Sequence, residues 1–250
     1  MKNKIILFLI MALMLGCTES VKRLEYEDFD ENKLFPLHEL YNMRTYRHID
    51  KALATPDAVY KLSLIKNGLV AVPEEVYEFK YLNTLELTMN ELNDLPVYIG
   101  DMLYLQSLYL TSNKFTMVPE PVYNLKNLKR IRMGGNQLSE IPQQLVMMQS
   151  IQELFFGKNM ITEIPSATFD MQDLYVLKLN HNKIEHLSPK IAQLEKLEVL
   201  NLSSNNISEI PFDALKAMRR LKALDFRNNN MNVEVLDSLQ KVMTWAKIYY

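Results

Sequence analysis

One apolar pattern recurs along this chain with a nearly constant period, and it limits the possible folds more than any other feature. Its first apolar position falls at Val59, Leu82, Leu105, Leu128, Ile151, Leu174, Leu197 and Leu221. Six of the seven intervals are 23 residues and the last is 24 residues. A fixed period of this length is typical of solenoids, in which each unit packs only against its neighbours. The sequence therefore predicts a stack of eight similar units.

Each unit has the form L-x-x-L-x-L-x-x-N-x-L, as in Leu82 to Leu92. The alternation Leu-x-Leu predicts a short strand whose leucines point inward and whose other residues point outward. The Asn follows where the chain leaves the strand, and its amide can bind backbone N–H and C=O groups that no strand partner reaches. The pattern predicts a ladder of eight side chains, Asn67, Asn90, Asn113, Asn136, Asn159, Asn182, Asn205 and Asn229.

The second half of each unit predicts the return path. Six units carry Pro after the fourteenth-position apolar residue, at Pro73, Pro96, Pro119, Pro142, Pro165 and Pro211. Pro fixes φ and suits the start of a short helical or extended return. The apolar residues that follow, such as Val76 and Phe79, are expected to pack inward from that side.

With these motifs, residues 59–231 resemble a leucine-rich-repeat domain of the 23-residue type. The resemblance implies an α/β repeat solenoid. In that horseshoe a parallel β-sheet forms the concave face, and short helices or turns form the convex face. The departures from the family pattern are local, since Met133, Phe156 and Phe226 replace inner leucines.

A solenoid needs both ends covered, because a terminal unit otherwise exposes apolar surface and an open strand edge. Residues 37–58 are expected to form an N-terminal cap, because Tyr46, Ile49, Ala52 and Leu53 follow helical spacing and Pro56 ends the segment.

Residues 232–250 are expected to form a C-terminal cap helix, since Leu236, Leu239, Met243 and Ala246 follow the same spacing. The aromatic residues Trp245, Tyr249 and Tyr250 complete this cap or belong to a partner interface.

The start of the chain predicts export. Lys2 and Lys4 precede eleven apolar residues, Ile5 to Leu15. Eleven helical residues at about 1.5 Å each cannot cross a hydrocarbon core of roughly 30 Å, so residues 1–16 are interpreted as a signal peptide.

The Gly16-Cys17 step that follows resembles the lipobox of bacterial lipoproteins. The resemblance implies that lipid is attached to Cys17 and anchors the protein to the bacterial cell envelope, where it faces the periplasm or the exterior. The alternative is an ordinary secreted protein with a chance Cys.

Residues 17–36 are expected to be an acidic tether that acts as a solvated spacer. Six carboxylates lie between Thr18 and Lys33, with few aliphatic residues. The segment lacks the Gly and the further oxygen ligands of a helix–loop–helix calcium site, so no metal site is predicted.

The sequence offers no catalytic chemistry. Only one Cys is present, no two of the four His residues have zinc-ligand spacing, and Gly-rich phosphate loops and nucleophile elbows do not occur. His181 and His186 flank a repeat turn and are expected to face solvent. The net charge of -2 gives no basic excess for nucleic acid. We therefore expect a binding protein without cofactor or metal, not an enzyme.

Binding is expected on the concave face. Adjacent strands lie about 4.8 Å apart, so Tyr109, Arg132, Phe155 and Lys178 form one row roughly 14 Å long, with Arg130 and Glu153 beside it. Exposed aromatic and Arg side chains are typical of interaction hot spots. Gly134, Gly135 and Gly157 are expected to leave room for a partner. The alternative is that Arg130, Arg132 and Glu153 form cross-strand ion pairs without a binding role.

Three functions remain open for this protein. A protein ligand is the first expectation. Glycan capture would use Tyr109 and Phe155 as stacking platforms, and an architectural role in the envelope would place the contacts on the convex face and the caps.

Overall fold

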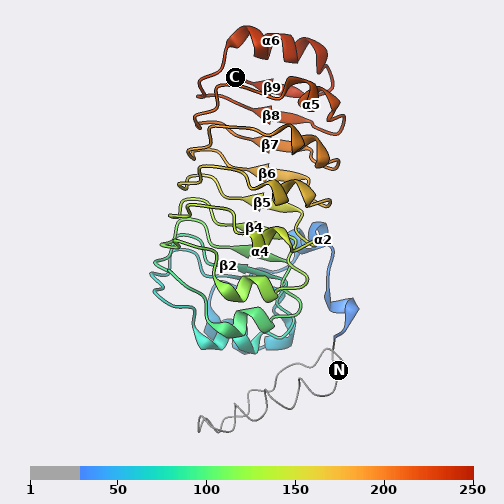
Figure 1. Ribbon diagram of the computed structural model, residues 1–250. Coiled ribbons are helices and arrows are strands. Elements are labelled where there is room, and N and C mark those ends of the chain that lie inside the picture. The colour runs from blue at the N-terminus through green and yellow to red at the C-terminus, as the bar shows by residue number, and fades with distance from the viewer. Residues whose placement is uncertain (1–28) are drawn as a thin grey trace, which may run out of the picture.

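A computed structural model describes residues 29–250, and it is a single stack of nine parallel strands in sequential order (Figure 1). The predicted signal peptide and Cys17 lie outside the described residues. The strands are β1 (Lys61–Ser63), β2 (Thr84–Glu86), β3 (Ser107–Tyr109), β4 (Arg130–Arg132), β5 (Glu153–Phe155), β6 (Val176–Lys178), β7 (Val199–Asn201), β8 (Ala223–Asp225) and β9 (Lys247–Tyr249).

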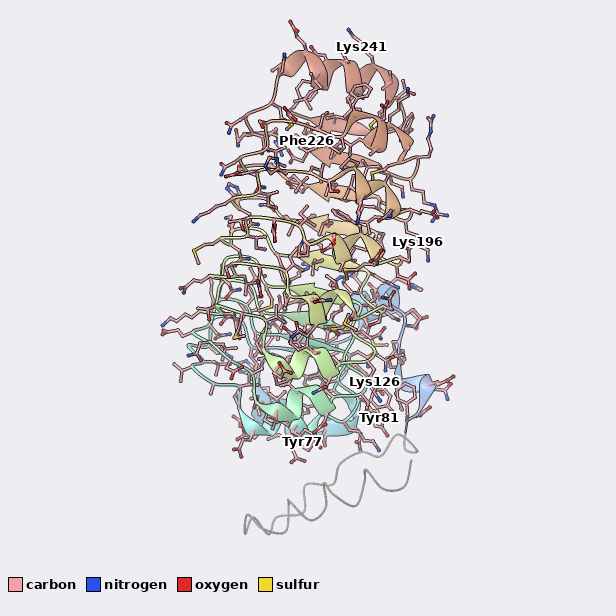
Figure 2. The ribbon with its side chains drawn as sticks, in the orientation of Figure 1. Tyr77, Tyr81, Lys126, Lys196, Phe226 and Lys241 are labelled. Atoms are coloured by element: carbon pink, nitrogen blue, oxygen red, sulfur yellow. The ribbon has the colours of Figure 1, made fainter. Side chains whose placement is uncertain are left out.

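The predicted inward positions form one continuous core. Each strand places its central apolar residue beside that of the next, as in Leu85 beside Leu108 and Ile131 beside Leu154. The first apolar position of every unit, from Val59 to Leu221, is buried. Figure 2 shows Phe226 within the stack, whereas Lys196 and Lys241 point outward. The predicted concave sheet is confirmed.

The return segments are short helices on the side opposite the sheet (Figure 1). Most begin after the repeat Pro, and Val76, Phe79, Ile99 and Val122 are fully buried beneath them, as predicted. The helices are η4 (Glu74–Glu78), η5 (Val97–Asp101), η6 (Glu120–Asn124), α4 (Gln143–Val146), η7 (Ser166–Asp170), η8 (Pro189–Gln193) and α5 (Phe212–Ala217).

The unit with 24 residues keeps the sheet register. β7 and β8 pair Leu200 with Leu224 like every other neighbouring pair. In this unit the return segment is the six-residue α-helix α5, where most other units have a five-residue 3₁₀ helix. The convex side therefore accommodates the extra residue.

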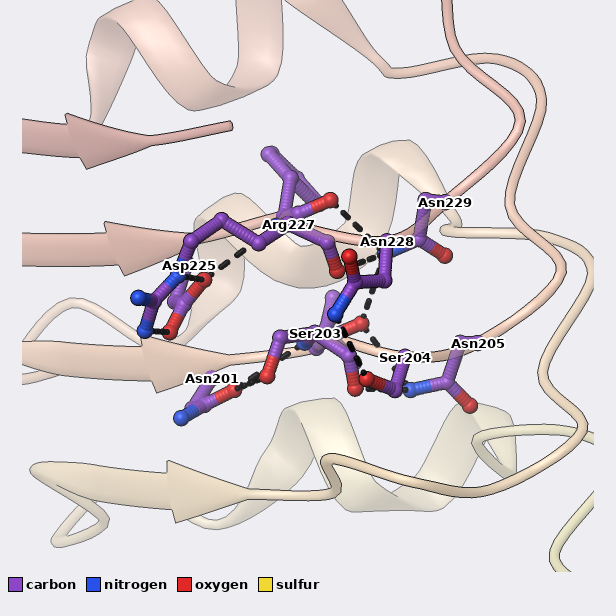
Figure 3. Close-up of polar contacts among 10 residues, drawn as sticks. Asn201, Ser203, Ser204, Asn205, Asp225, Arg227, Asn228 and Asn229 are labelled. Carbon is purple, nitrogen blue, oxygen red and sulfur yellow. Dashed lines mark hydrogen bonds and ion pairs between the residues drawn. The ribbon is translucent and has the colours of Figure 1, made fainter.

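Seven of the eight predicted asparagines form the ladder. Asn113 is representative, since its Nδ2 donates to the carbonyl oxygens of Leu87 and Leu110 at 3.0 and 3.1 Å, and its Oδ1 accepts from the Leu92 N–H at 3.0 Å. Figure 3 shows the same turns around Asn205 and Asn229. The exception is Asn67, in the first unit, whose side chain is exposed and forms no such bond with the described residues.

The residue before each ladder Asn adopts a left-handed backbone. These residues are Lys66, Met89, Ser112, Gly135, Lys158, His181, Ser204 and Asn228, with φ between 55° and 68°. Residues other than Gly usually disfavour this region by roughly 1–2 kcal/mol. At the residues other than Gly135 the turn is therefore maintained against local preference. The hydrogen bonds of the following Asn compensate in six of these seven units, whereas Lys66 adopts the same conformation before Asn67, whose side chain forms no such bond with the described residues.

Replacing Asn136 by Ala tests the ladder. The change removes the bonds to the Leu110 and Met133 carbonyls and leaves the Phe115 N–H without its acceptor. We expect the free energy of unfolding to fall by about 1–3 kcal/mol, measured by urea denaturation. The exposed Asn67→Ala is the matched control and should change it by less than about 0.5 kcal/mol. Equal effects of the two changes would contradict the ladder argument.

The N-terminal end differs from the predicted helix. Tyr46 lies in an isolated parallel bridge to Leu62 and extends the sheet, while the helix α3 (Ile49–Leu53) begins three residues later. Ala52 is buried and Leu53 is 36% exposed, and η3 (Pro56–Ala58) leads into β1. Helical spacing alone could not separate a bridge residue from a helix residue over so few positions.

The expected solvated tether is wrong for its described part, residues 29–36. These residues lie against the repeats, and the Asp30 N–H donates to the Tyr104 hydroxyl at 2.6 Å. The segment contains η2 (Glu31–Lys33) and leads into α2 (Leu37–Asn42). Figure 1 shows α2 at the level of β4, beside the stack.

The C-terminal end corrects a second expectation. The cap helix α6 covers only Val233–Val242, and Lys247–Tyr249 form β9, a ninth strand paired with β8. The Gln240 side chain donates to the Met243 and Ala246 carbonyls and accepts from the Ile248 N–H, which fixes the turn between helix and strand. Trp245 is packed at this end, where its Nε1–H donates to the Met218 carbonyl at 3.2 Å.

Within residues 29–250, no helix combines the length and the apolar character that a membrane crossing needs.

Candidate functional site

The four residues of the predicted row lie side by side on the concave face. Strand pairing puts Tyr109 next to Arg132, Arg132 next to Phe155, and Phe155 next to Lys178. All four are half-buried. The repeat period alone fixes this neighbourhood, because residues 23 positions apart occupy the same place on adjacent strands.

Rings and cations alternate along this row, which we call the concave stack (Tyr109, Arg132, Phe155, Lys178). The Arg132 guanidinium carbon lies 4.7 Å from the Tyr109 ring centre and 4.4 Å from the Phe155 ring centre. The Lys178 ammonium lies 4.9 Å from the Phe155 ring centre. Each contact of this kind contributes about 0.5–1 kcal/mol at an exposed site. The side chains are therefore ordered before any partner arrives.

Arg130 and Glu153 form a second, more buried group beside the concave stack. The Arg130 guanidinium donates two hydrogen bonds to the Glu153 carboxylate, and its Nη1 donates to the Tyr109 hydroxyl at 3.1 Å. The Tyr175 hydroxyl donates to Glu153 at 2.5 Å. Glu153 is only 5% exposed. Arg130 and Glu153 therefore form the cross-strand ion pair that the alternative interpretation predicted, and Arg130 also binds the Tyr109 hydroxyl of the concave stack.

The ionisation of this group follows from its contacts. Burial alone would raise the pKa of Glu153, but the hydrogen bonds from Arg130 and Tyr175 and the charges of Arg130 and Arg132 outweigh burial, so the pKa lies below its ordinary value. Burial and the Glu153 carboxylate raise the pKa of Tyr175 to about 12. The pair therefore stays charged, and the phenol stays protonated, near neutral pH.

Arg132 is bound differently from Arg130. Its Nη2 lies 3.9 Å from the Glu153 carboxylate, and its side chain is 40% exposed. Its Nε is buried and has no hydrogen-bond partner among the described residues. Arg132 therefore retains donor capacity at the centre of the concave stack.

The glycines do not leave the space that the sequence suggested. A Cβ on Gly157 would lie 2.5 Å from the Asn180 Oδ1 and 2.9 Å from the Asn180 carbonyl oxygen, and a Cβ on Gly134 would lie 3.0 Å from the Gly157 carbonyl oxygen. The neighbouring unit already fills these positions. Gly135 has φ +68° and serves the left-handed turn before Asn136. These glycines are required for close approach and turning, so the expectation of free room is wrong.

Tyr175 is the residue that sequence reasoning missed. It lies just before β6, at a position that faces neither the core nor the predicted row. Among the described residues no three His, Cys, Asp or Glu side chains gather as metal ligands do, and His181 and His186 are exposed as expected.

Comparison with known proteins found one matching family model and several similar solved structures. A leucine-rich-repeat family model matches residues 172–231. A leucine-rich-repeat protein of Leptospira interrogans is 28% identical with a TM-score of 0.64, and the match covers 76% of this chain and 54% of that one. An internalin of Listeria monocytogenes is 26% identical with a TM-score of 0.67, covering 79% and 56%. No curated protein sequence matches the chain.

A third similar structure comes from a plant. The leucine-rich-repeat ectodomain of a membrane receptor kinase from Arabidopsis thaliana is 27% identical with a TM-score of 0.62, and the match covers 75% of this chain and 23% of the other. The chain spans about half the length of the two bacterial proteins. The nine-stranded open sheet, the asparagine ladder and these matches together show the leucine-rich-repeat solenoid fold, with leucine-rich repeats matched over residues 172–231.

Proposed function

We propose that this protein is a non-enzymatic binding module that recognises a protein ligand through the concave stack. The observation that carries the proposal is the ordered alternation of two rings and two cations, half-exposed at the centre of the sheet. The leucine-rich-repeat fold is itself that of a protein-binding module. The Arabidopsis ectodomain was solved in complex with Casparian strip integrity factor 2, which supports a protein ligand here.

The charge balance of the site defines the chemistry of the ligand. Glu153 neutralises Arg130, whereas Arg132 and Lys178 lie over aromatic faces and remain partly exposed. The ligand therefore carries carboxylates next to apolar side chains, so that the former bind Arg132 and Lys178 and the latter pack on Tyr109 and Phe155.

The same contacts disfavour glycan capture. Both Arg132 and Lys178 lie over the Phe155 ring, and Arg132 also lies over the Tyr109 ring. A sugar that stacks on either ring would have to displace a cation. A protein ligand can instead bind the same cations in place through its carboxylates.

Replacing Arg132 and Phe155 together by Ala tests the site. Two hot-spot residues of about 2 kcal/mol each predict a loss of ligand affinity of at least a hundredfold. The experiment captures ligands from envelope extract with wild-type protein and with the double variant, identifies them by mass spectrometry, and measures the affinity of each by titration.

The matched control replaces Arg227 and Tyr249, a cation–ring pair near the far end of the same face, with the guanidinium carbon 5.3 Å from the ring centre. This control should retain the ligand. A ligand that binds wild type and the Arg132/Phe155 variant equally would contradict the proposal and direct attention to the convex face.

We further propose that the protein is exported and held at the bacterial envelope by lipid on Cys17, as its lipobox-like start implies. Cys17→Ser should move the protein from the membrane fraction to the soluble fraction, with a loss of mass equal to the lipid. An unchanged mass and an unchanged membrane fraction would overturn the anchor.

A further inference from the structure

The residues before the first cap lie across the amino ends of the first strands. We call residues 29–36 the strap, and the repeat residues that contact it (Tyr60, Tyr81, Asn83, Tyr104, Gln106) the track. The contacts between strap and track join residues 25 to 75 positions apart in the sequence. None of the track residues belongs to the concave stack.

Two side-chain amides of the track bind the strap backbone. The Asn83 Oδ1 accepts from the Phe35 N–H at 3.2 Å, and its Nδ2 donates to the Lys33 carbonyl at 2.9 Å. The Gln106 Nε2 donates to the Phe35 carbonyl at 2.5 Å and to the Asn83 Oδ1 at 2.7 Å. Both amides are fully buried. Because they bind only main-chain groups of the strap, they would bind another peptide whose backbone follows the same path.

Aromatic residues of the track supply the side-chain selectivity. The Phe35 ring lies edge-on to Tyr60 with centres 4.8 Å apart, and the Phe29 ring stacks on Tyr104 with centres 5.0 Å apart. The Lys33 ammonium lies 5.2 Å from the Tyr81 ring centre. The track therefore recognises two aromatic side chains six positions apart with a cation between them.

The strap is held less firmly than the repeats. No strap residue is buried, and the first buried residue of the described chain is Leu40. Segments with few buried apolar contacts open at low free-energy cost. The strap can therefore leave the track while the solenoid stays folded.

The strap also fits the track incompletely. The Gln106 Oε1 is buried and has no hydrogen-bond partner among the described residues. This oxygen belongs to the same amide whose nitrogen binds Phe35. A peptide with a further donor at this point would satisfy a group that the strap leaves unpaired.

We propose that the track is a peptide-binding site and that the strap is its resident, replaceable ligand. The incoming ligand is a peptide that follows the backbone path of the strap, including its turn at Glu31–Lys33, with two aromatic side chains six residues apart and an additional donor for Gln106 Oε1. Past Phe35 an open groove of about 690 Å³, lined by Pro36, Tyr41, Lys129, Gln152 and Tyr175 among others, can receive a longer peptide.

The test uses the full chain with a weakened strap and a labelled synthetic peptide with the sequence of residues 29–36. Phe29→Ala with Phe35→Ala removes both aromatic contacts of the strap and leaves the track intact. We expect this variant to bind the peptide at least tenfold more tightly than wild type does, because the tethered strap competes at a millimolar effective concentration. Fluorescence anisotropy measures both affinities.

Two further changes in the weakened-strap background locate the binding. Gln106→Ala should lower the peptide affinity at least tenfold. Glu198→Ala is the matched control, since Glu198 holds the equivalent repeat position just before β7 and its side chain binds Lys222, not the strap. This control should bind the peptide unchanged.

Melting curves verify the fold of every variant. If Gln106→Ala does not fold, the half-exposed Tyr60→Ala replaces it, with the same expected loss. Absence of peptide binding to the weakened-strap variant, or equal binding by the Gln106 and Glu198 variants, overturns the proposal. Because Phe155 and Arg132 are intact throughout, failure here leaves the concave stack untouched.

Discussion

Replacing Arg130 by Ala is expected to lower the free energy of unfolding by about 3–5 kcal/mol, because it leaves the buried Glu153 carboxylate without its main partner. The Tyr175 hydroxyl still donates to Glu153 but carries no charge. Urea denaturation measures the loss. Lys196→Ala, which breaks an exposed pair with Asp173, is the control and should cost less than about 1 kcal/mol.

A double-mutant cycle separates the pair from its surroundings. Arg130→Ala with Glu153→Ala should cost less than the sum of the single changes, because no unpaired charge remains. Simple additivity would show that the two side chains act independently and would contradict the ion-pair argument.

The pH dependence of the free energy of unfolding tests the same ion pair. The pKa of Glu153 is lower in the folded protein than in the unfolded chain. Its contribution is therefore complete above the unfolded value of about 4.3 and is lost as the pH falls through the lower folded value. The stability difference between wild type and Glu153→Gln should shrink in that acidic range and stay constant between pH 6 and 8.

Replacing Phe156 by Ala is expected to cost about 3–5 kcal/mol, since this fully buried ring fills a position where most units have Leu. In a solenoid each unit is stabilised only by its neighbours, so a central cavity weakens both sides of the stack. Differential scanning calorimetry should show a lower or a divided transition.

Phe156→Leu is the matched control for this position. It restores the usual repeat residue and should cost less than about 1.5 kcal/mol. A loss as large as that of the Ala variant would show that the neighbouring units have adapted to the aromatic ring in a way that Leu cannot replace.

The strands, the ladder and the row of the concave stack could be predicted because they follow from the period. Residues 23 positions apart must lie side by side once one unit is known, so Tyr109, Arg132 and Phe155 were placed correctly without coordinates. The alternation of rings and cations was visible in the same way. The identity of the ligand could not be predicted, because the period constrains the inward residues that determine the fold and not the outward residues that would contact a ligand.

The strap, β9 and the role of the glycines could not be predicted, each for a physical reason. The strap has no periodicity, and its contacts with Asn83 and Tyr104 join residues 48 and 74 positions apart. β9 is three residues long, too short for an alternation to be recognised after a helix. Gly157 is required by the approach of Asn180 from the next unit, which is not apparent within a single unit.

The left-handed residue that precedes each ladder asparagine gives the molecule a series of regularly spaced attachment points. Met89, Lys158 and His181 are exposed there, outside both the core and the concave stack. Successive positions lie about one strand spacing apart, roughly 4.8 Å. Because their side chains contribute little to packing, probes or cross-linkers placed at these points would form a ruler along the solenoid, against which the position of a bound ligand can be measured.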